Sequence, residues 1–114
     1  LQEAAVQALA TPAEWIEERN RVYRERLDLL VDGLRAAGFA VRSPRATLYL
    51  WVPVPAPAEA FARDLLMSTG VAVAPGAFFG PAGEGYVRVA ITAPAGTIRE
   101  AMSRLQRWRA AASP

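Results

Sequence analysis

The spacing of apolar residues along this chain first predicts a long helix. Between residues 16 and 34 the apolar positions recur three, four or seven residues apart, which is typical of one helix face. They are Ile16, Tyr23, Leu27, Leu30 and Leu34. Thr11 as the cap, Pro12 as the first helical residue and Glu14 as the capping-box carboxylate predict the start of this helix. Gly38 predicts its end, and a short helix is predicted before it, over residues 1–10.

After Gly38 the apolar period falls to two, which is typical of strands. We predict a short strand over residues 39–42 and a second one over residues 47–52, which is rich in β-branched and aromatic side chains. Ser43-Pro44 is a predicted turn. The two strands are therefore expected to pair as a hairpin.

The remaining residues predict two more helices and two more strands. One helix begins at Pro57 and ends at Gly70, and the other begins at Pro94. Strands are predicted over residues 71–74 and 86–91, on either side of a glycine-rich loop. This order predicts an α+β domain of two layers, in which helices cover a small, mostly antiparallel sheet behind a long connecting helix.

One arginine, Arg88, lies among apolar residues in the strand 86–91. Alternation places Val87, Val89 and Ile91 on one strand face and Arg88 on the other. A guanidinium fixed on a strand can bind a carboxylate through two parallel charge-assisted hydrogen bonds. We therefore predict a carboxylate-binding site at Arg88. The alternative is that Arg88 pairs with an acidic residue at the surface.

The loop before this strand contains glycines at positions 76, 80, 83 and 85, which allow a ligand to approach the backbone closely. Phe78 and Phe79 are candidates to exclude water from the site, or alternatively to fill the core. Glu84 is predicted to be a turn or capping carboxylate, because no second carboxylate shares acid–base work with it. Tyr49 and Trp51 lie on one strand face and are predicted to pack in the core or at an interface.

The composition excludes several classes of function. The 114 residues fit one domain, and they include thirteen arginines and eleven acids but no lysine, histidine or cysteine. The chain therefore lacks histidine and cysteine as metal ligands and the lysine of a phosphate-binding Walker loop. The charges are interleaved with a net value of only +2, so we expect no nucleic-acid partner. No apolar run is long enough to span a membrane, and residues 1–10 include Glu3 and lack a basic leader, so we expect a cytoplasmic protein.

Four segments resemble, in the same order, the C-terminal part of class I/II pyridoxal-phosphate-dependent aminotransferases. The signature-like segment is PGAFFGPAGEGYVRVAIT, residues 75–92. The others are LQEAAVQAL (1–9), YRERLDLLVDGLRAAGF (23–39) and SPRATLYLWVPVP (43–55). Within this family, RATLYLW is most similar to the diaminopimelate and succinyldiaminopimelate aminotransferases. The chain is thus identified as the small C-terminal domain of a fold type I enzyme of this family.

This resemblance implies that Arg88 binds the α-carboxylate of an amino acid or 2-oxo acid and that Phe79 lines the entrance to the site. It also implies pyridoxal 5'-phosphate as the cofactor, bound by a larger upstream domain that carries the Schiff-base lysine. No catalytic, cofactor-binding or metal-binding residue is therefore assigned to this chain. Leu48 and Arg45 depart from the phenylalanine and lysine that are usual in the family, which bears on side-chain specificity.

The same resemblance implies a homodimer that acts in lysine biosynthesis. Residues 1–38 would be connecting helices, and residues 39–114 the small domain that closes on the substrate. The predicted function is transfer of an amino group between an amino acid and a 2-oxo acid, in a longer chain, because this one has no lysine. The alternative is a non-catalytic α+β module that binds small carboxylates or RNA.

Overall fold

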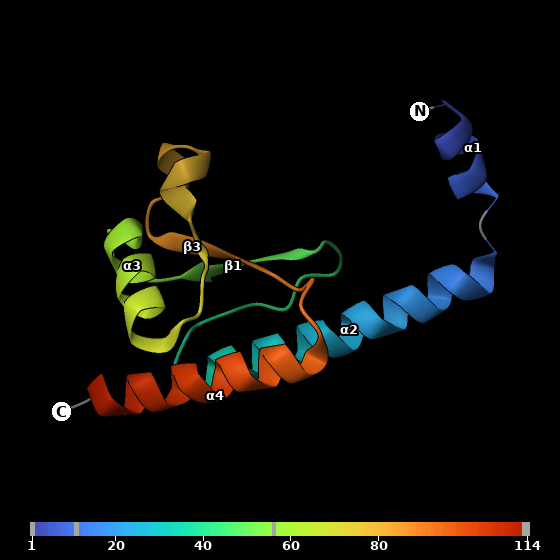
Figure 1. The fold of residues 1–114 in the computed structure, drawn as a ribbon. Coiled ribbons are helices and arrows are strands. Elements are labelled where there is room, and N and C mark those ends of the chain that lie inside the picture. Colours follow the sequence, from blue (N-terminus) through green and yellow to red (C-terminus); the bar gives the residue numbers. More distant parts are fainter. Residues whose placement is uncertain (1, 11, 56, 113–114) are drawn as a thin grey trace.

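The computed structural model describes residues 2–10, 12–55 and 57–112, which form helices and a small sheet (Figure 1). The elements are, in order, α1 (Gln2–Leu9), α2 (Ala13–Ala36), β1 (Tyr49–Pro53), α3 (Ala58–Thr69), β2 (Ala74–Pro75), the 3-10 turns η1 (Gly76–Phe79) and η2 (Pro81–Gly83), β3 (Tyr86–Ala90) and α4 (Ala95–Ala112). The predicted α+β class is confirmed.

The sheet has three antiparallel strands in the order β1-β3-β2, so the last strand in sequence is the middle one in space. Its register places Trp51 of β1 and Ala74 of β2 on either side of Arg88. Two backbone hydrogen bonds extend the pairing beyond the strand ends, from Val54 to Gly85 and from Ile91 to Leu48. Arg88 therefore lies at the centre of the sheet.

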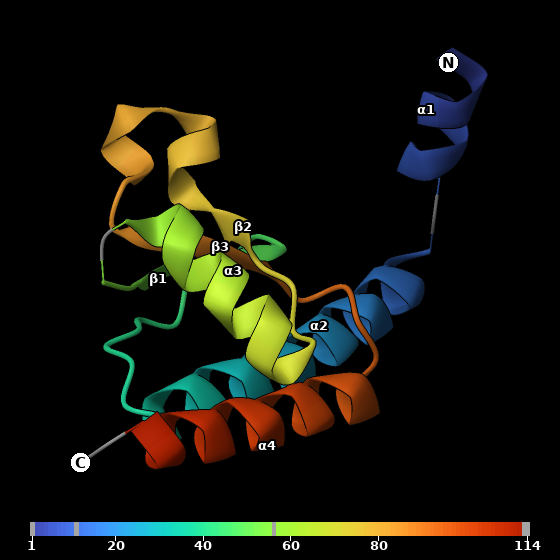
Figure 2. The ribbon, with the colours of Figure 1, turned by 60° about the vertical axis from the view of Figure 1, so that its left-hand side comes forward.

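One face of the sheet packs against helices, and the core lies between them. The second half of α2 and the whole of α4 lie side by side, with α3 beside the sheet (Figures 1 and 2). The buried apolar side chains of this core include Leu27, Leu30, Val31, Leu34, Leu50, Val52, Ala58, Ala62, Leu65, Val87, Ile91, Ile98, Met102 and Leu105. The alternation of exposed and buried residues in β1 confirms that only one sheet face is covered.

The predicted strand over residues 39–42 and its hairpin are wrong. Phe39 and Val41 are buried, but the carbonyl of Val41 accepts a hydrogen bond from Arg35 Nε at 3.1 Å and Phe39 N donates to Leu34 O. The segment is therefore held by the end of α2, while β1 pairs with β3. An extended segment that buries every second residue shows the same period as a strand. The strand predicted over residues 71–74 is also displaced, to Ala74–Pro75.

The predicted helix ends agree with the structure at the glycines. Gly70 has a φ of 76° and donates its N–H to Leu66 O, and Gly38 has a φ of 92° just after the last turn of α2. Pro12 was predicted as the first helical residue, but its ψ of 142° is not helical and α2 begins one residue later, at Ala13. The cap predicted at Thr11 lies outside the described residues.

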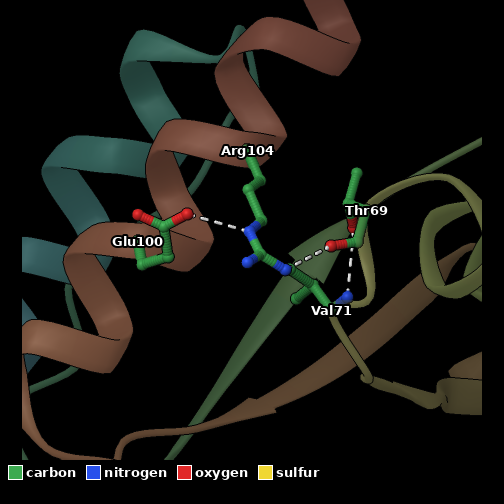
Figure 3. Close-up of polar contacts among 4 residues, drawn as sticks. All are labelled: Thr69, Val71, Glu100 and Arg104. Atoms are coloured by element: carbon green, nitrogen blue, oxygen red, sulfur yellow. Dashed lines mark hydrogen bonds and ion pairs between the residues drawn. The ribbon is translucent and has the colours of Figure 1, made fainter.

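Arg104 connects α4 to the end of α3 (Figure 3). Its Nε donates to Glu100 Oε1 at 2.9 Å, and its guanidinium also donates to the carbonyl of Thr69 at 3.2 Å. The hydroxyl of Thr69 donates to Leu65 O and accepts the N–H of Val71. These bonds satisfy the backbone where α3 turns into the sheet.

The N-terminal elements extend away from this body (Figures 1 and 2). The apolar side chains of Val6, Leu9, Trp15 and Ile16 are exposed there. Among the helices of the described part, none is long and apolar enough to cross a membrane.

Candidate functional site

Arg88 lies in the middle strand on the sheet face that no helix of the described chain buries. Alternation along β3 buries Val87 against the helices and directs Arg88 to the opposite face, as predicted. Tyr49 and Trp51 of β1 lie on this same face, 40% and 44% exposed. The site is therefore built on rigid strands and is open to a ligand.

Two aromatic rings hold the guanidinium of Arg88. Its Cζ lies 4.1 Å from the ring centroid of Tyr49 and 4.3 Å from that of Phe79. Within the described residues, its side chain forms no hydrogen bond or ion pair. The alternative of a surface ion pair is thus not observed there. The ring faces attract the positive charge, but they are not the oxygen or nitrogen acceptors that form conventional hydrogen bonds. The five N–H donors of the guanidinium are therefore not used by these contacts.

The rings around Arg88 also contact one another. Trp51 meets Phe79 edge to face at 5.8 Å and Tyr86 at 6.4 Å. These two contacts join three elements, namely β1, η1 and β3. A pocket of about 430 Å³ lies beside them, and its lining residues are Trp51, Phe79, Ala82, Gly83 and Tyr86.

This arrangement decides between several of the predictions. Phe78 and Phe79 are 67% and 51% exposed, so they do not fill the core, and Phe79 is the one that reaches Arg88. Tyr49 and Trp51 are not core residues either. Packing at an interface stays a prediction for both.

The glycine-rich loop is compact because two of its glycines touch through their backbones. A Cβ at Gly76 would lie 2.7 Å from Tyr86 O and closer still to Gly83 O. A Cβ at Gly83 would overlap the backbone of Gly76. The turns η1 and η2 can therefore pack together only without side chains at these positions, and this packing places Phe79 over the sheet.

Glu84 is a capping residue, as predicted. Its Oε1 accepts the backbone N–H of Ala58, the first residue of α3, at 2.7 Å. A carboxylate at a helix N-terminus satisfies a donor that has no partner within the helix and faces the positive end of the helix dipole. Glu84 thereby fixes the end of the glycine-rich loop to α3.

In the described residues, no group of three or more acidic, histidine or cysteine side chains is placed to hold a metal ion. The arrangement can bind a planar carboxylate, because the guanidinium of Arg88 offers parallel N–H donors on an open sheet face.

Comparison with known proteins assigns the family. The family model for aminotransferases of class I and II matches residues 1–105. The chain belongs to this family. The aminotransferase relatives include the LL-diaminopimelate aminotransferase of Desulforudis audaxviator, which is 44% identical over 108 residues, and that of Moorella thermoacetica, 40% identical over 109 residues. These alignments cover 93% and 94% of this chain and 28% of each relative.

Solved aminotransferase structures have the same fold. An aromatic aminotransferase from Pyrococcus horikoshii superposes with a TM-score of 0.85 at 32% identity, covering 94% of this chain and 30% of that one. A probable N-succinyldiaminopimelate aminotransferase from Thermus thermophilus gives 0.80 at 39% identity, covering 90% and 28%. The chain corresponds to the C-terminal part of such enzymes, and the predicted resemblance is confirmed.

The sequence prediction missed one residue of this site. Arg88 and Phe79 were predicted and lie together, but Tyr49 was not expected to contact the guanidinium. The only available signal was its place on the same face as Trp51, and that signal becomes specific only once the β1–β3 register is known.

Proposed function

We propose that this part of an aminotransferase binds the α-carboxylate of an amino-acid or 2-oxo-acid substrate through Arg88. One observation supports this most directly. The guanidinium is fixed on an exposed sheet face by two rings, while its N–H donors have no partner among the described residues. A carboxylate can accept two of these donors in parallel.

The role of Arg88 in this proposal is binding and orientation. An arginine side chain keeps its proton in proteins, so it does not transfer one to the substrate. A substrate held at its carboxylate has its α-carbon and nitrogen at a fixed distance from the sheet. Such placement lowers the entropic part of the barrier for any reaction at that carbon. Phe79 lines the entrance and excludes water from one side of the bound carboxylate.

The family implies pyridoxal 5'-phosphate, which supplies an electron sink for the reaction when it is bound. The 114 residues contain no lysine, so no side chain here offers the amine for its covalent attachment. The residues present therefore do not fit the attachment site of this cofactor. Attachment has to come from other residues of a complete enzyme.

The relatives suggest which substrate the complete enzyme uses. The chain spans about 28% of the length of the curated relatives it matches, and those named above are LL-diaminopimelate aminotransferases. We infer an enzyme of lysine biosynthesis with LL-diaminopimelate as its amino-acid substrate, which acts as a cytoplasmic homodimer. Arg45 and Leu48, just before β1, are the positions of this chain at which we expect differences in side-chain specificity.

The test replaces Arg88 in the complete enzyme and uses LL-diaminopimelate as the substrate. We expect Arg88→Ala to reduce kcat/KM by about 30-fold to 5,000-fold, the effect of truncating one partner of a buried charge pair. Arg88→Lys should recover part of the loss, because it keeps the charge without the planar fork. Steady-state kinetics measures both effects.

A matched control is Arg63→Ala. Arg63 is an exposed arginine whose Nη2 lies 3.9 Å from Oε1 of Glu59. This variant should leave kcat/KM within about twofold, as expected for a surface ion pair. Borohydride reduction followed by intact-mass measurement should still find a retained pyridoxyl group in Arg88→Ala. Unchanged kinetics in that variant would show that Arg88 does not bind the substrate.

A further inference from the structure

We infer that Tyr49 is a positioning residue, whose ring holds the Arg88 guanidinium in the orientation that receives the substrate carboxylate. This inference rests on the proposed role of Arg88. It adds a residue from a different strand to the site and explains why the guanidinium is held without using its hydrogen-bond donors.

The strand register brings the two side chains together. Tyr49 lies opposite Ala90, and Trp51 lies opposite Arg88, so Tyr49 is the diagonal neighbour of Arg88. Diagonal neighbours on one sheet face are about 7–8 Å apart at the backbone, within the reach of long side chains. The small side chain of Ala90 leaves room for the guanidinium to lie over the ring of Tyr49, 4.1 Å from its centroid.

Phe79 limits the guanidinium from a second element. Its centroid lies 4.3 Å from Cζ, and its ring is in turn held by the edge contact with Trp51. Rings on β1 and η1 thus restrict a side chain that starts from β3. Restricting the free side chain reduces the ordering cost of binding, and the in-plane N–H donors stay available for a ligand.

The contact uses the ring of Tyr49 and not its hydroxyl. Among the described residues, the hydroxyl of Tyr49 forms no hydrogen bond, whereas the ring face meets the guanidinium. Phenylalanine should therefore replace tyrosine at this position, while an aliphatic residue should not. This difference separates positioning of Arg88 from any polar role of Tyr49.

The experiment is a double-mutant cycle in the complete enzyme with LL-diaminopimelate. We expect Tyr49→Leu to lower kcat/KM by about 3-fold to 30-fold, the range of a partly exposed to desolvated cation–π contact, mainly through KM. Tyr49→Phe should stay within about twofold of the parent enzyme. In the Arg88→Ala background, Tyr49→Leu should have no further effect, because the group it positions is gone.

Tyr23→Leu is the matched control for this cycle. Tyr23 of α2 also meets guanidinium groups, with the Cζ atoms of Arg19 and Arg26 at 5.4 and 5.5 Å from its ring centroid, but it is not one of the rings around Arg88. The effect of Tyr23→Leu should be the same with and without Arg88. If Tyr49→Leu fails to fold, as judged by circular dichroism, Tyr49→Thr takes its place, since threonine is a good strand former.

The outcomes separate the inference from the proposed function. The positioning role of Tyr49 is overturned if Arg88→Ala lowers kcat/KM but Tyr49→Leu does not. It is also overturned if Tyr49→Leu lowers kcat/KM by the same factor with and without Arg88. If Arg88→Ala itself has no effect, the proposed function fails first. Loss in Tyr49→Leu, recovery in Tyr49→Phe and disappearance of the loss without Arg88 together support the inference.

Discussion

Arg88 and Arg104 show that the neighbours of an arginine determine what its guanidinium can bind. The guanidinium of Arg104 donates to a carboxylate and to a backbone carbonyl, and it thereby joins two helices. The guanidinium of Arg88 contacts two ring faces, which attract its charge but leave its donors available. The first arginine is structural, and the second is suited to a ligand.

At the residue scale, Glu84 gives a direct test of the loop anchor. Glu84→Ala removes the acceptor for the N–H of Ala58, so we expect the free energy of unfolding to fall by about 1 kcal/mol. Glu84→Gln should lose less, because its amide oxygen can accept the same bond. Amide hydrogen exchange, read by mass spectrometry over the first turn of α3, should show faster exchange in Glu84→Ala.

Glu18→Ala serves as the comparison, because its side chain is an exposed surface group of α2, paired with Arg21 and outside α3. Equal exchange rates in Glu84→Ala and the parent chain would mean that this cap does not hold the loop.

The role of Glu84 and the direction of Arg88 were predictable, whereas the contact of Tyr49 was not. Alternation within one strand determines which face carries Arg88, and this information is local. The contact between Tyr49 and Arg88 depends on the pairing of strands that lie far apart in sequence. The alternation of residues within one strand does not show which other strand it pairs with.

At the scale of elements, the contact between α2 and α4 depends on Gly33. A Cβ there would lie 2.7 Å from Met102 Cβ and Sδ, within the packed core. In Gly33→Ala, we expect overpacking to lower the free energy of unfolding by about 3 kcal/mol. The higher helix propensity of alanine should raise it by about 1 kcal/mol. Urea unfolding followed by circular dichroism should therefore show a net loss of about 2 kcal/mol.

Gly96→Ala is the matched variant in α4. A Cβ at Gly96 would meet nothing within 4 Å, so this change should raise the free energy of unfolding by up to about 1 kcal/mol. Opposite signs for the two glycines are the expected result. A stabilising effect of Gly33→Ala would show that α4 can shift away from α2 at no cost.

The helices were predicted well from the sequence, and the sheet pairing was not. A helix is defined by local periodicity and by end signals such as Gly70, and both are visible in the sequence. The segment over residues 39–42 has the alternation of a strand because Phe39 and Val41 pack into the core. Its hydrogen bonds to the end of α2, from Arg35 to Val41 O and from Phe39 N to Leu34 O, show that it does not belong to the sheet.

At the scale of the whole molecule, the chain is elongated. Its radius of gyration is 16.3 Å, and its extents are 55 × 30 × 23 Å, whereas a compact domain of about 100 residues has a radius of gyration of about 13 Å. The projecting α1 and the first half of α2 account for this shape (Figure 1). The proposed boundary between residues 38 and 39 stays a prediction, although α2 already contributes Leu27 to Leu34 to the core.

This distribution of the core predicts how the chain responds to truncation. Removal of residues 1–12 should change the free energy of unfolding by no more than about 0.5 kcal/mol, because the core residues begin at Leu27. Leu30→Ala should instead lower the free energy of unfolding by about 2–5 kcal/mol, since the side chain of Leu30 is only 2% exposed. Urea unfolding gives the free energies of unfolding of the parent chain, the truncated chain and Leu30→Ala for comparison. A large loss on truncation would contradict the assignment of the core.

The position of β3 as the middle strand has a consequence for synthesis on the ribosome. β1 and β2 have no partner until residue 90 has been made, because each of them pairs with β3. The helix contacts form later still: Gln106 bonds to Gly33 and Arg109 to Ala37, across 73 and 72 residues. A nascent chain that stops before β3 therefore exposes the apolar face of α2 and both unpaired strands. Such a product is a target for chaperones and proteases.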